Sequence, residues 1–507
     1  MTKRMNEGAD GAFTKEKRKV MKRWSVAVLM ITLSMPFFAG CGTSQNSETA
    51  KVKLDPDNPV SLTVWHYYNG AQQATFDTLV EEFNATVGKE KGIYVEEYSQ
   101  GSVYDLEQAV QSAIKGEVGA DDLPDIFSSY ADTAYYAQQE GKLVDLTQYF
   151  SEDELSSYVD SYIEEGYFQD DGALYLLPVA KSTEIMMINK TDWEPFAAET
   201  GSSLDELKTI EGVVDVAERY YEWTDAKTPD IPDDGKAFYG RDSMSNYFII
   251  GMKQMGKEIF EVKNGEVTLN TDKESMRRLW DDYYVPYVKG YFESYGKFRS
   301  DDVKTGDILA YTGATSSAVY FPDNVENGEE SYPIDYIIQD APIMQDGENY
   351  MVQQGAGMAV TKSDDAHEYA SCVFLKWITE KEQNLRFGCD SAYLPVLKEA
   401  NKVETLDKVI KDNNIEINEK SYDCLKYILE NFDQKKFYTP KSFRKGYDAR
   451  KILDYNLSDK AVEDKTAIDA AIAEGTSRDE VLESYLSDEA FENWYNDFCS
   501  SLSAAAK

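Results

Sequence analysis

The chain has 507 residues and a formal net charge of −40 at pH 7. This charge excludes a nucleic-acid-binding role, because contacts to phosphates require a basic surface. The hydrophobic content of 42%, with 36 Tyr, 22 Phe and 7 Trp, supports a large core in two or three domains and excludes extended disorder. Only two histidines are present, His66 and His367, so neither a His-based catalytic triad nor a His-rich metal site is expected.

Residues 1–40 have the pattern of an export signal. A cluster of Lys and Arg at positions 15–23 precedes an uncharged run, residues 24–39, which leads into Phe38-Ala39-Gly40-Cys41. The run is about 16 residues long, at or below what a membrane-spanning helix needs. Small residues directly before a cysteine are typical of a bacterial lipoprotein box, which predicts cleavage before Cys41 and attachment of lipid, palmitate included, to its sulfur. An uncleaved anchor or a short membrane helix is the alternative, and Met21 is a second candidate start.

These features predict a protein on the extracellular face of the bacterial cell membrane, attached through its lipid. The segment from Ser44 to Lys53 is polar and small, and residues 41–57 are predicted to form a flexible tether between the lipid and a globular body.

The first part of that body alternates predicted strands and helices. Val60, Leu62 and Val64 alternate with polar residues, as in a strand, whereas apolar residues at 76–83 follow helical spacing. The same reading predicts strands at 93–98 and 123–127 and a helix at 106–114. This alternation predicts a parallel sheet covered by helices.

A second set of elements follows. Strands are predicted at 172–178, 184–189, 307–311, 336–341 and 357–360. Capping-box spacing at Ser203/Glu206 and at Thr271/Glu274 predicts two helix starts. An apolar stripe predicts a helix at 370–378, and the chain after Pro395 is expected to be mainly helical. Two α/β halves followed by helices predict a bilobal α/β protein.

We expect no metal site and no cofactor. Cys372, Cys389, Cys424 and Cys499 are widely spaced without a C-x-x-C pair, so they are interpreted as buried small hydrophobic residues, although a Cys372–Cys389 disulfide stays open. The acidic loop at 230–234 lacks the ligand spacing of a calcium-binding loop.

Aromatic residues follow several predicted strands. Trp65, Tyr67, Tyr130 and the segment 311–313 lie where strands end, and ligands of open α/β sheets bind beyond the carboxyl ends of strands. Aromatic faces stack on sugar rings, and tyrosine hydroxyls form hydrogen bonds. The pattern therefore favours a carbohydrate ligand.

The chain from about Val60 to its end resembles the extracellular solute-binding protein family 1 of ABC importers, the maltose-binding-protein-like group. The resemblance is carried by Leu62-Thr63-Val64-Trp65-His66, Leu123-Pro124-Asp125-Ile126, the crossover from Leu177 to Lys190, the segment 355–360, Phe374-Leu375-Lys376-Trp377 and Tyr393-Leu394-Pro395-Val396. It implies the type II periplasmic-binding-protein-like fold. Residues 58–177 and 350–390 would form the first lobe, and residues 178–349 and 391–507 the second.

The resemblance also implies a monomer that captures a sugar, oligosaccharide or glycerol-3-phosphate and delivers it to an ABC permease without catalysis. The glycerol-3-phosphate-binding members are the most similar in pattern. Their ligand positions correspond to Tyr104, Asp132, Ser182, Thr315 or Ser316, Gly355, Tyr393 and Arg450, where Asp132 replaces a Glu with a spacing shifted by one. An arginine, hydroxyl donors and an open backbone N–H suit a phosphate.

Two other functions remain open from the sequence. An exported glycoside hydrolase would use a pair of carboxyl groups, and the many acidic residues do not exclude one. A sugar sensor or adhesin would use the same binding fold without a permease.

Overall fold

The computed structural model describes residues 52–507 except 170, 264 and 329–330, and these belong to one compact unit, Thr49–Lys507. The predicted signal peptide, the lipidation site Cys41 and most of the predicted tether lie outside the described residues. Among the helices of the described part, none is long and apolar enough to cross a membrane.

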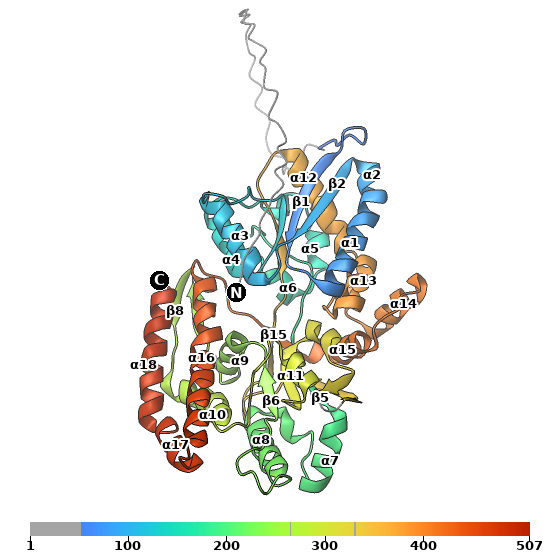
Figure 1. The fold of residues 1–507 in the computed structure, drawn as a ribbon. Coiled ribbons are helices and arrows are strands. Elements are labelled where there is room, and N and C mark those ends of the chain that lie inside the picture. Colours follow the sequence, from blue (N-terminus) through green and yellow to red (C-terminus); the bar gives the residue numbers. More distant parts are fainter. Residues whose placement is uncertain (1–51, 170, 264, 329–330) are drawn as a thin grey trace, which may run out of the picture. The chain divides into compact units, whose positions relative to one another are not determined.

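The first sheet combines early and late parts of the chain (Figure 1), in the order β2-β1-β3-β14-β4. Its strands are β1 (Val60–His66), β2 (Ile93–Ser99), β3 (Ile126–Ser129), β4 (Leu177–Pro178) and β14 (Gly357–Val360). β1 is parallel to β2 and β3, which confirms the predicted parallel arrangement, whereas β14 is antiparallel to β3.

Two predicted strands of this sheet are shorter than expected. β3 begins at Ile126 rather than residue 123, because Pro124 has no N–H to donate and the Asp125 carboxylate accepts a hydrogen bond from the Thr63 N–H (2.8 Å). The strand predicted at 172–178 is reduced to Leu177–Pro178, since the N–H groups of Leu174 and Tyr175 bond to Asp145 and Gly166 in loops.

The second sheet has the order β12-β5-β9-β6, with β5 fully buried at its centre. Its strands are β5 (Glu184–Asn189), β6 (Tyr239–Arg241), β9 (Ala310–Ala314) and β12 (Tyr336–Asp340). β9 starts later than the predicted residue 307, because the N–H groups of Asp307 and Ile308 bond to the Asp302 carbonyl at the end of the preceding helix. Three further pairs lie outside the sheets: β7 (Phe260–Lys263) with β8 (Glu266–Leu269), β10 (Asn324–Glu326) with β11 (Ser331–Pro333), and β13 (Tyr350–Val352) with β15 (Lys436–Tyr438).

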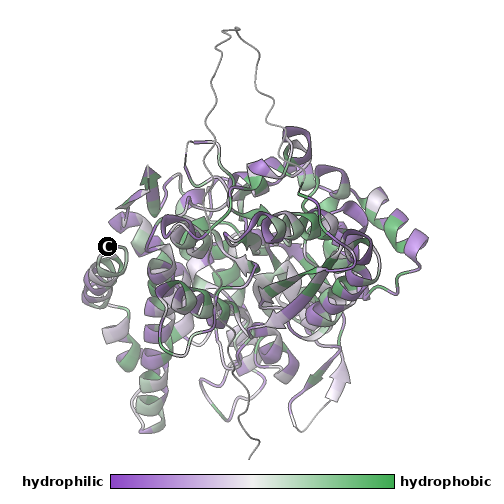
Figure 2. Ribbon diagram, turned by 90° about the horizontal axis from the view of Figure 1, so that it is seen from above, coloured by the Kyte–Doolittle hydropathy of each residue, from purple (hydrophilic) through white to green (hydrophobic). Residues whose placement is uncertain are grey.

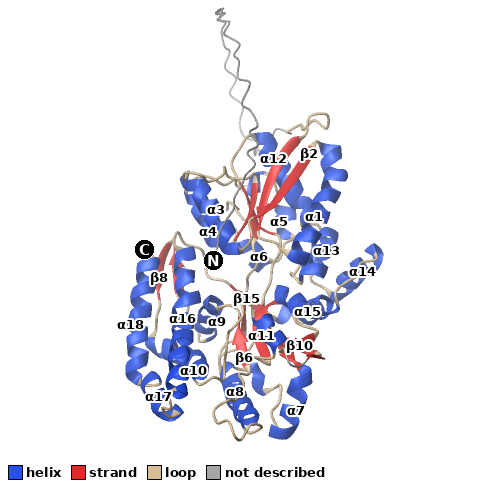
Figure 3. Ribbon diagram, viewed as in Figure 1, coloured by secondary structure: helices blue, strands red, loops and turns tan. Residues whose placement is uncertain are grey.

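Helices pack against both sheets (Figure 3). Those beside the first sheet are α1 (Gly70–Ala85), α2 (Val87–Lys91), α3 (Val103–Lys115), α4 (Ala131–Gln139), α5 (Glu152–Ser156), α6 (Asp160–Glu164), α12 (Asp365–Ile378) and α13 (Lys381–Ser391). The others are α7 (Lys190–Thr200), α8 (Ile210–Asp225), α9 (Met244–Gln254), α10 (Lys273–Val288), α11 (Arg299–Thr305), α14 (Val403–Asn413), α15 (Glu419–Leu429), α16 (Gly446–Ala473), α17 (Arg478–Tyr485) and α18 (Asp488–Ala505).

We call the first sheet with its helices the first lobe, and the second sheet with its helices the second lobe. Separate hydrophobic clusters fill them: one includes Leu62, Phe127 and Met358, and the others are built around the two faces of β5. Hydrophobic residues gather on the central strands and inner helix faces, and hydrophilic residues gather outside (Figure 2). The lobe limits given above at 177/178, 349/350 and 390/391 stay a prediction.

The two predicted capping boxes differ from the observed helix starts. The Ser203 N–H bonds to the Glu206 carboxylate (2.7 Å), but the following regular helix, α8, begins only at Ile210. At α10 the capping residue is Asp272, one residue later than predicted, and it accepts from the Ser275 N–H (3.0 Å).

Cys372 and Cys389 do not form the disulfide that the sequence allowed. Both are free and buried, as expected if they are small hydrophobic residues of the core.

Candidate ligand site between the lobes

Extended segments carry the chain from one lobe to the other. Residues 179–183 lead from β4 to β5, and residues 353–356 lead from β13 back to β14. They run antiparallel, because Ser182 and Gln354 exchange backbone hydrogen bonds of 2.9 and 3.0 Å. A third segment, around Leu394, pairs with Lys181 on the other side. Together these segments form the hinge.

Gly355 allows the hinge segments to approach closely. Its φ is +88°, a conformation that L side chains rarely adopt, and a Cβ placed there would clash with the Ala180 carbonyl and lie 2.9 Å from the Lys181 Cα. The glycine predicted as an open backbone position is therefore required by packing, whatever it does for a ligand.

Predicted ligand residues from both lobes meet beside this hinge. The hydroxyls of Ser182 and Thr315 are 2.9 Å apart, and both residues are buried. The hydroxyls of Tyr67 and Tyr393 are 3.3 Å apart, and the Tyr393 ring stacks on Phe387. Thr315 opens the short 3-10 helix Thr315–Tyr320, which also carries Ser316.

The tyrosines of this group are protonated donors at neutral pH. Burial raises the pKa of Tyr67 and of Tyr393, and hydrogen bonding to Ser316 and Tyr67 opposes the rise at Tyr393. Burial also raises the pKa of Tyr130, which precedes α4. The site thus offers neutral hydroxyl donors and acceptors, a set that suits sugar hydroxyls.

Asp132 and Arg450 form an ion pair between the lobes. Asp132 lies in α4 of the first lobe, and its Oδ2 accepts from Arg450 Nε of α16 at 2.6 Å. Asp132 is 6% exposed, and α16 approaches so closely at Gly446 that a Cβ there would clash with its carboxylate. Nearby in α3, burial and the Asp132 charge raise the pKa of Glu107 to about 8.

Tyr104 belongs to a neighbouring contact between α3 and α16. Its hydroxyl donates to Asp454 Oδ2 (2.8 Å), and Asp454 Oδ1 accepts from the Ser245 N–H at the start of α9 (2.8 Å). Burial, together with the Asp454 charge, raises the pKa of Tyr104. Its hydroxyl is thus already engaged by an acidic residue.

A polar network behind Ser182 was not predicted from the sequence. Glu184 and Arg241 form a buried ion pair of 3.1 Å, and Asn246 bonds to both Glu184 (2.9 Å) and Gln354 (2.7 Å). The sequence did hold a signal for Glu184, because it is a charged residue at the start of an otherwise apolar strand, Glu184–Asn189. Arg241 and Asn246 lie in segments without a recognisable pattern.

Two aromatic positions of the predicted set lie inside the protein. Trp65 is 8% exposed within the hydrophobic cluster of the first lobe, and Tyr311 is fully buried in β9. Next to Trp65, His66 bonds to Glu97 (2.7 Å) through Nε2 and accepts from the Tyr68 N–H (3.1 Å) through Nδ1. Burial lowers the pKa of His66 to about 4, so it is a neutral structural residue.

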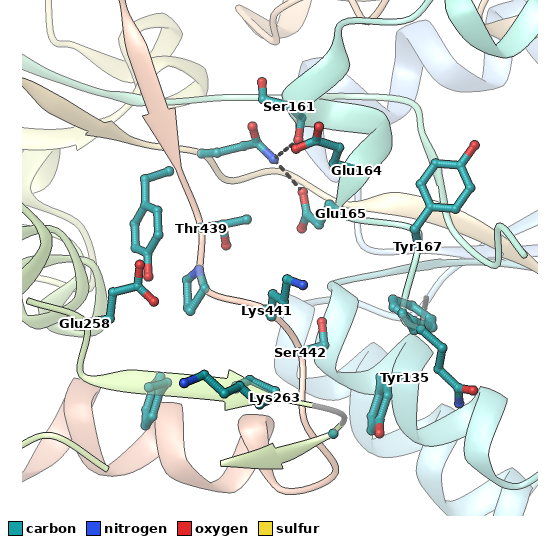
Figure 4. Close-up of a pocket in the computed structure, with 18 of the residues that line it drawn as sticks. Tyr135, Ser161, Glu164, Glu165, Tyr167, Glu258, Lys263, Thr439, Lys441 and Ser442 are labelled. Carbon is teal, nitrogen blue, oxygen red and sulfur yellow. Dashed lines mark hydrogen bonds between the residues drawn. The ribbon is translucent and has the colours of Figure 1, made fainter. Parts of the chain in front are cut away.

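A cavity of about 1050 Å³ lies elsewhere between the lobes (Figure 4). Its walls come from α4, α6, residues 167–169 and 171, β7 and residues 437–442, and no predicted ligand residue lines it.

Comparison with known proteins identifies the family. The model of the bacterial extracellular solute-binding protein family matches residues 78–416. No curated protein matches the sequence.

Solved structures share the fold at low identity. The cyclic α-maltosyl-1,6-maltose-binding protein from Arthrobacter globiformis is 19% identical over 87% of this chain and 99% of its own, with a TM-score of 0.57. An ABC substrate-binding protein from Listeria monocytogenes in complex with cycloalternan is 18% identical over 88% of this chain and 100% of its own, with a TM-score of 0.61. UgpB from Mycobacterium tuberculosis in complex with glycerophosphocholine is 16% identical over 88% of this chain and 100% of its own, with a TM-score of 0.62.

These similarities confirm the predicted bilobal, type II α/β fold. The match to the family model covers most of the chain. The chain belongs to the bacterial extracellular solute-binding protein family.

Proposed function

We propose that this chain is the lipid-anchored substrate-binding protein of an ABC importer, which captures a neutral carbohydrate and delivers it unaltered to a permease. The observation that carries the proposal is the hydroxyl group cluster beside the hinge, where Ser182 contacts Thr315 and Tyr67 contacts Tyr393. A ligand that contacts both lobes binds the closed protein more tightly than the open protein. It therefore shifts the equilibrium toward the closed state.

A neutral ligand is favoured over glycerol-3-phosphate by the state of Arg450. Its Nε donates to Asp132, and the charge of Asp454 also acts on it, so the Arg450 charge is compensated within the protein. A phosphate bound to the other N–H groups of Arg450 would lie at short range from the Asp132 carboxylate, which would repel it. Sugar hydroxyls can instead bond to the ion pair without changing its charge.

A glycoside hydrolase is the second candidate, because Glu107 is protonated near neutral pH and lies beside the Asp132 carboxylate. A pair of carboxyl groups in different protonation states is the arrangement that sugar hydrolysis uses. Glu107, however, is only 5% exposed, and Asp132 is bound by Arg450. Incubation with oligosaccharides followed by mass spectrometry should return them intact; cleaved products would instead establish hydrolysis.

Calorimetric titration of the chain with a panel of neutral tri- and tetrasaccharides tests the site. We expect Ser182→Ala to weaken binding about fivefold to tenfold, since one hydrogen bond to the ligand is worth about 1 kcal/mol. Ser317→Ala is the matched control, because the Ser317 hydroxyl bonds to the Ala314 carbonyl (2.7 Å) in the same short helix. Equal affinities of the two variants, or heat from glycerol-3-phosphate alone, would reject the proposed site.

A further inference from the structure

The large cavity lies on the opposite side of the hinge from the cluster of Ser182 and Thr315. Adjacent residues of an extended segment point to opposite sides. In the return segment, the Gln353 side chain bonds to Ser161 (2.8 Å) and Glu165 (3.0 Å) at the cavity, whereas Gln354 bonds to Asn246.

The crossover segment shows the same division. Lys181 bonds to Glu165 at the cavity (2.5 Å), and Ser182 bonds to Thr315 on the other side. The hinge therefore separates two distinct sites.

Both lobes contribute to the walls of this cavity. Figure 4 shows Glu164 at the end of α6 and the adjacent Glu165 on one side, Lys263 of β7 on another, and Thr439 and Lys441 between them. Its volume of about 1050 Å³ is at the upper end of the range that holds small-molecule ligands.

The charges at the cavity are balanced. Of its carboxylates, Glu165 is paired with Lys181 (2.5 Å) and Glu258 with Lys253 (2.6 Å). Glu164 and Asp171 have no ion pair among the described residues, and neither do the lysines Lys263 and Lys441 on the facing walls. Because the unpaired residues carry two charges of each sign, the cavity has no excess charge that would attract a polycation or a phosphate.

The remaining lining combines aromatic rings with uncharged polar groups. Phe168 packs edge-on against Tyr135 (5.6 Å between centroids), and Tyr167, Phe437 and Tyr438 add further rings. Amides and hydroxyls of Gln139, Gln353, Thr439 and Ser442 lie among them. Aromatic faces next to amides and hydroxyls are the groups that bind sugar rings.

We propose that this cavity is a second binding site, for a neutral oligosaccharide, on the far side of the hinge from the proposed transport site. Because its walls belong to both lobes, the affinity of a sugar for this cavity depends on how the two lobes are arranged. Binding there is therefore coupled to binding at the first site.

Hydrogen exchange with neutral tetrasaccharides as probes tests this second site. We expect the sugar to slow exchange of residues 161–169 and 437–442, both in the unaltered chain and in the double variant Ser182→Ala/Thr315→Val, which weakens the first site. Failure of the transport site would remove binding at Ser182 but leave this protection in place, so the two proposals are separable.

Variants at the cavity then identify what binds. Phe168→Ala removes an aromatic ring from the cavity, and Ser442→Trp fills part of it. Each should reduce at least tenfold the factor by which the sugar slows hydrogen exchange at these residues. Glu164→Gln and Lys441→Gln should change this factor less than threefold. Tyr94→Ala, at a 48% exposed position on β2, is the control. Protection by spermine or inorganic phosphate instead of the sugars, no protection by any tetrasaccharide, or unchanged protection in Ser442→Trp would overturn the proposal.

Discussion

Glu107 is the residue with the strongest expected effect of pH at the candidate site. Its pKa is about 8 in the folded protein, against about 4.3 for an unperturbed Glu. Between these values the folded state holds a proton that the unfolded state has lost. Stability therefore falls as the pH rises from about 5 to 8 and levels off above 8.

Glu107→Gln should remove this part of the pH dependence. We expect the difference in unfolding free energy between the two proteins to change by about 3 kcal/mol from pH 5 to pH 8, in favour of the variant at pH 8. Denaturant titrations at both pH values measure it. A constant difference would show that Glu107 is ionised at pH 7 and that burial does not control its proton.

Residue types at the site were only partly predictable from the sequence. Ser182, Thr315, Tyr67 and Tyr393 were found from strand ends and from the family resemblance, and the structure brings them together in pairs. The pairing of Arg450 with Asp132 spans 318 positions in the chain, and no local pattern reports a contact of that range.

At the scale of elements, the hinge segments depend on Gly355. Gly355→Ala should lower the unfolding free energy by at least about 2 kcal/mol, since it combines an unfavourable φ with a clash against backbone atoms. Gly172→Ala is the control, because Gly172 has a similar φ of +78° and a Cβ added there would meet no atom within 4 Å. Denaturant midpoints measure both, and equal losses would show that close packing at the hinge contributes nothing.

Elements were predicted well where one local pattern decides them. The strands Glu184–Asn189 and Gly357–Val360 were predicted with their observed limits, because each is a short apolar run bounded by polar or turn residues. The strand predicted at 172–178 failed because hydrogen bonds to residues 145 and 166, remote in the sequence, hold that segment as a loop. Such partners are set by tertiary packing.

At the scale of the whole molecule, the proposed membrane attachment depends on Cys41. Cys41→Ala should release the protein from the membrane fraction, because attached acyl chains provide the anchoring free energy. Mass spectrometry of the unaltered chain should show an acylated residue 41. Membrane association retained in Cys41→Ala would point to an uncleaved apolar segment instead.

Binding of an unaltered neutral sugar beside the hinge is the central claim, and a crystal structure with an oligosaccharide that gives heat on titration tests it most directly. We predict an intact sugar within hydrogen-bond distance of the Ser182 and Thr315 hydroxyls, contacting both lobes, with Asp132 and Arg450 still paired. A cleaved sugar, a sugar bound to one lobe alone, or a phosphate ligand on Arg450 would contradict the account.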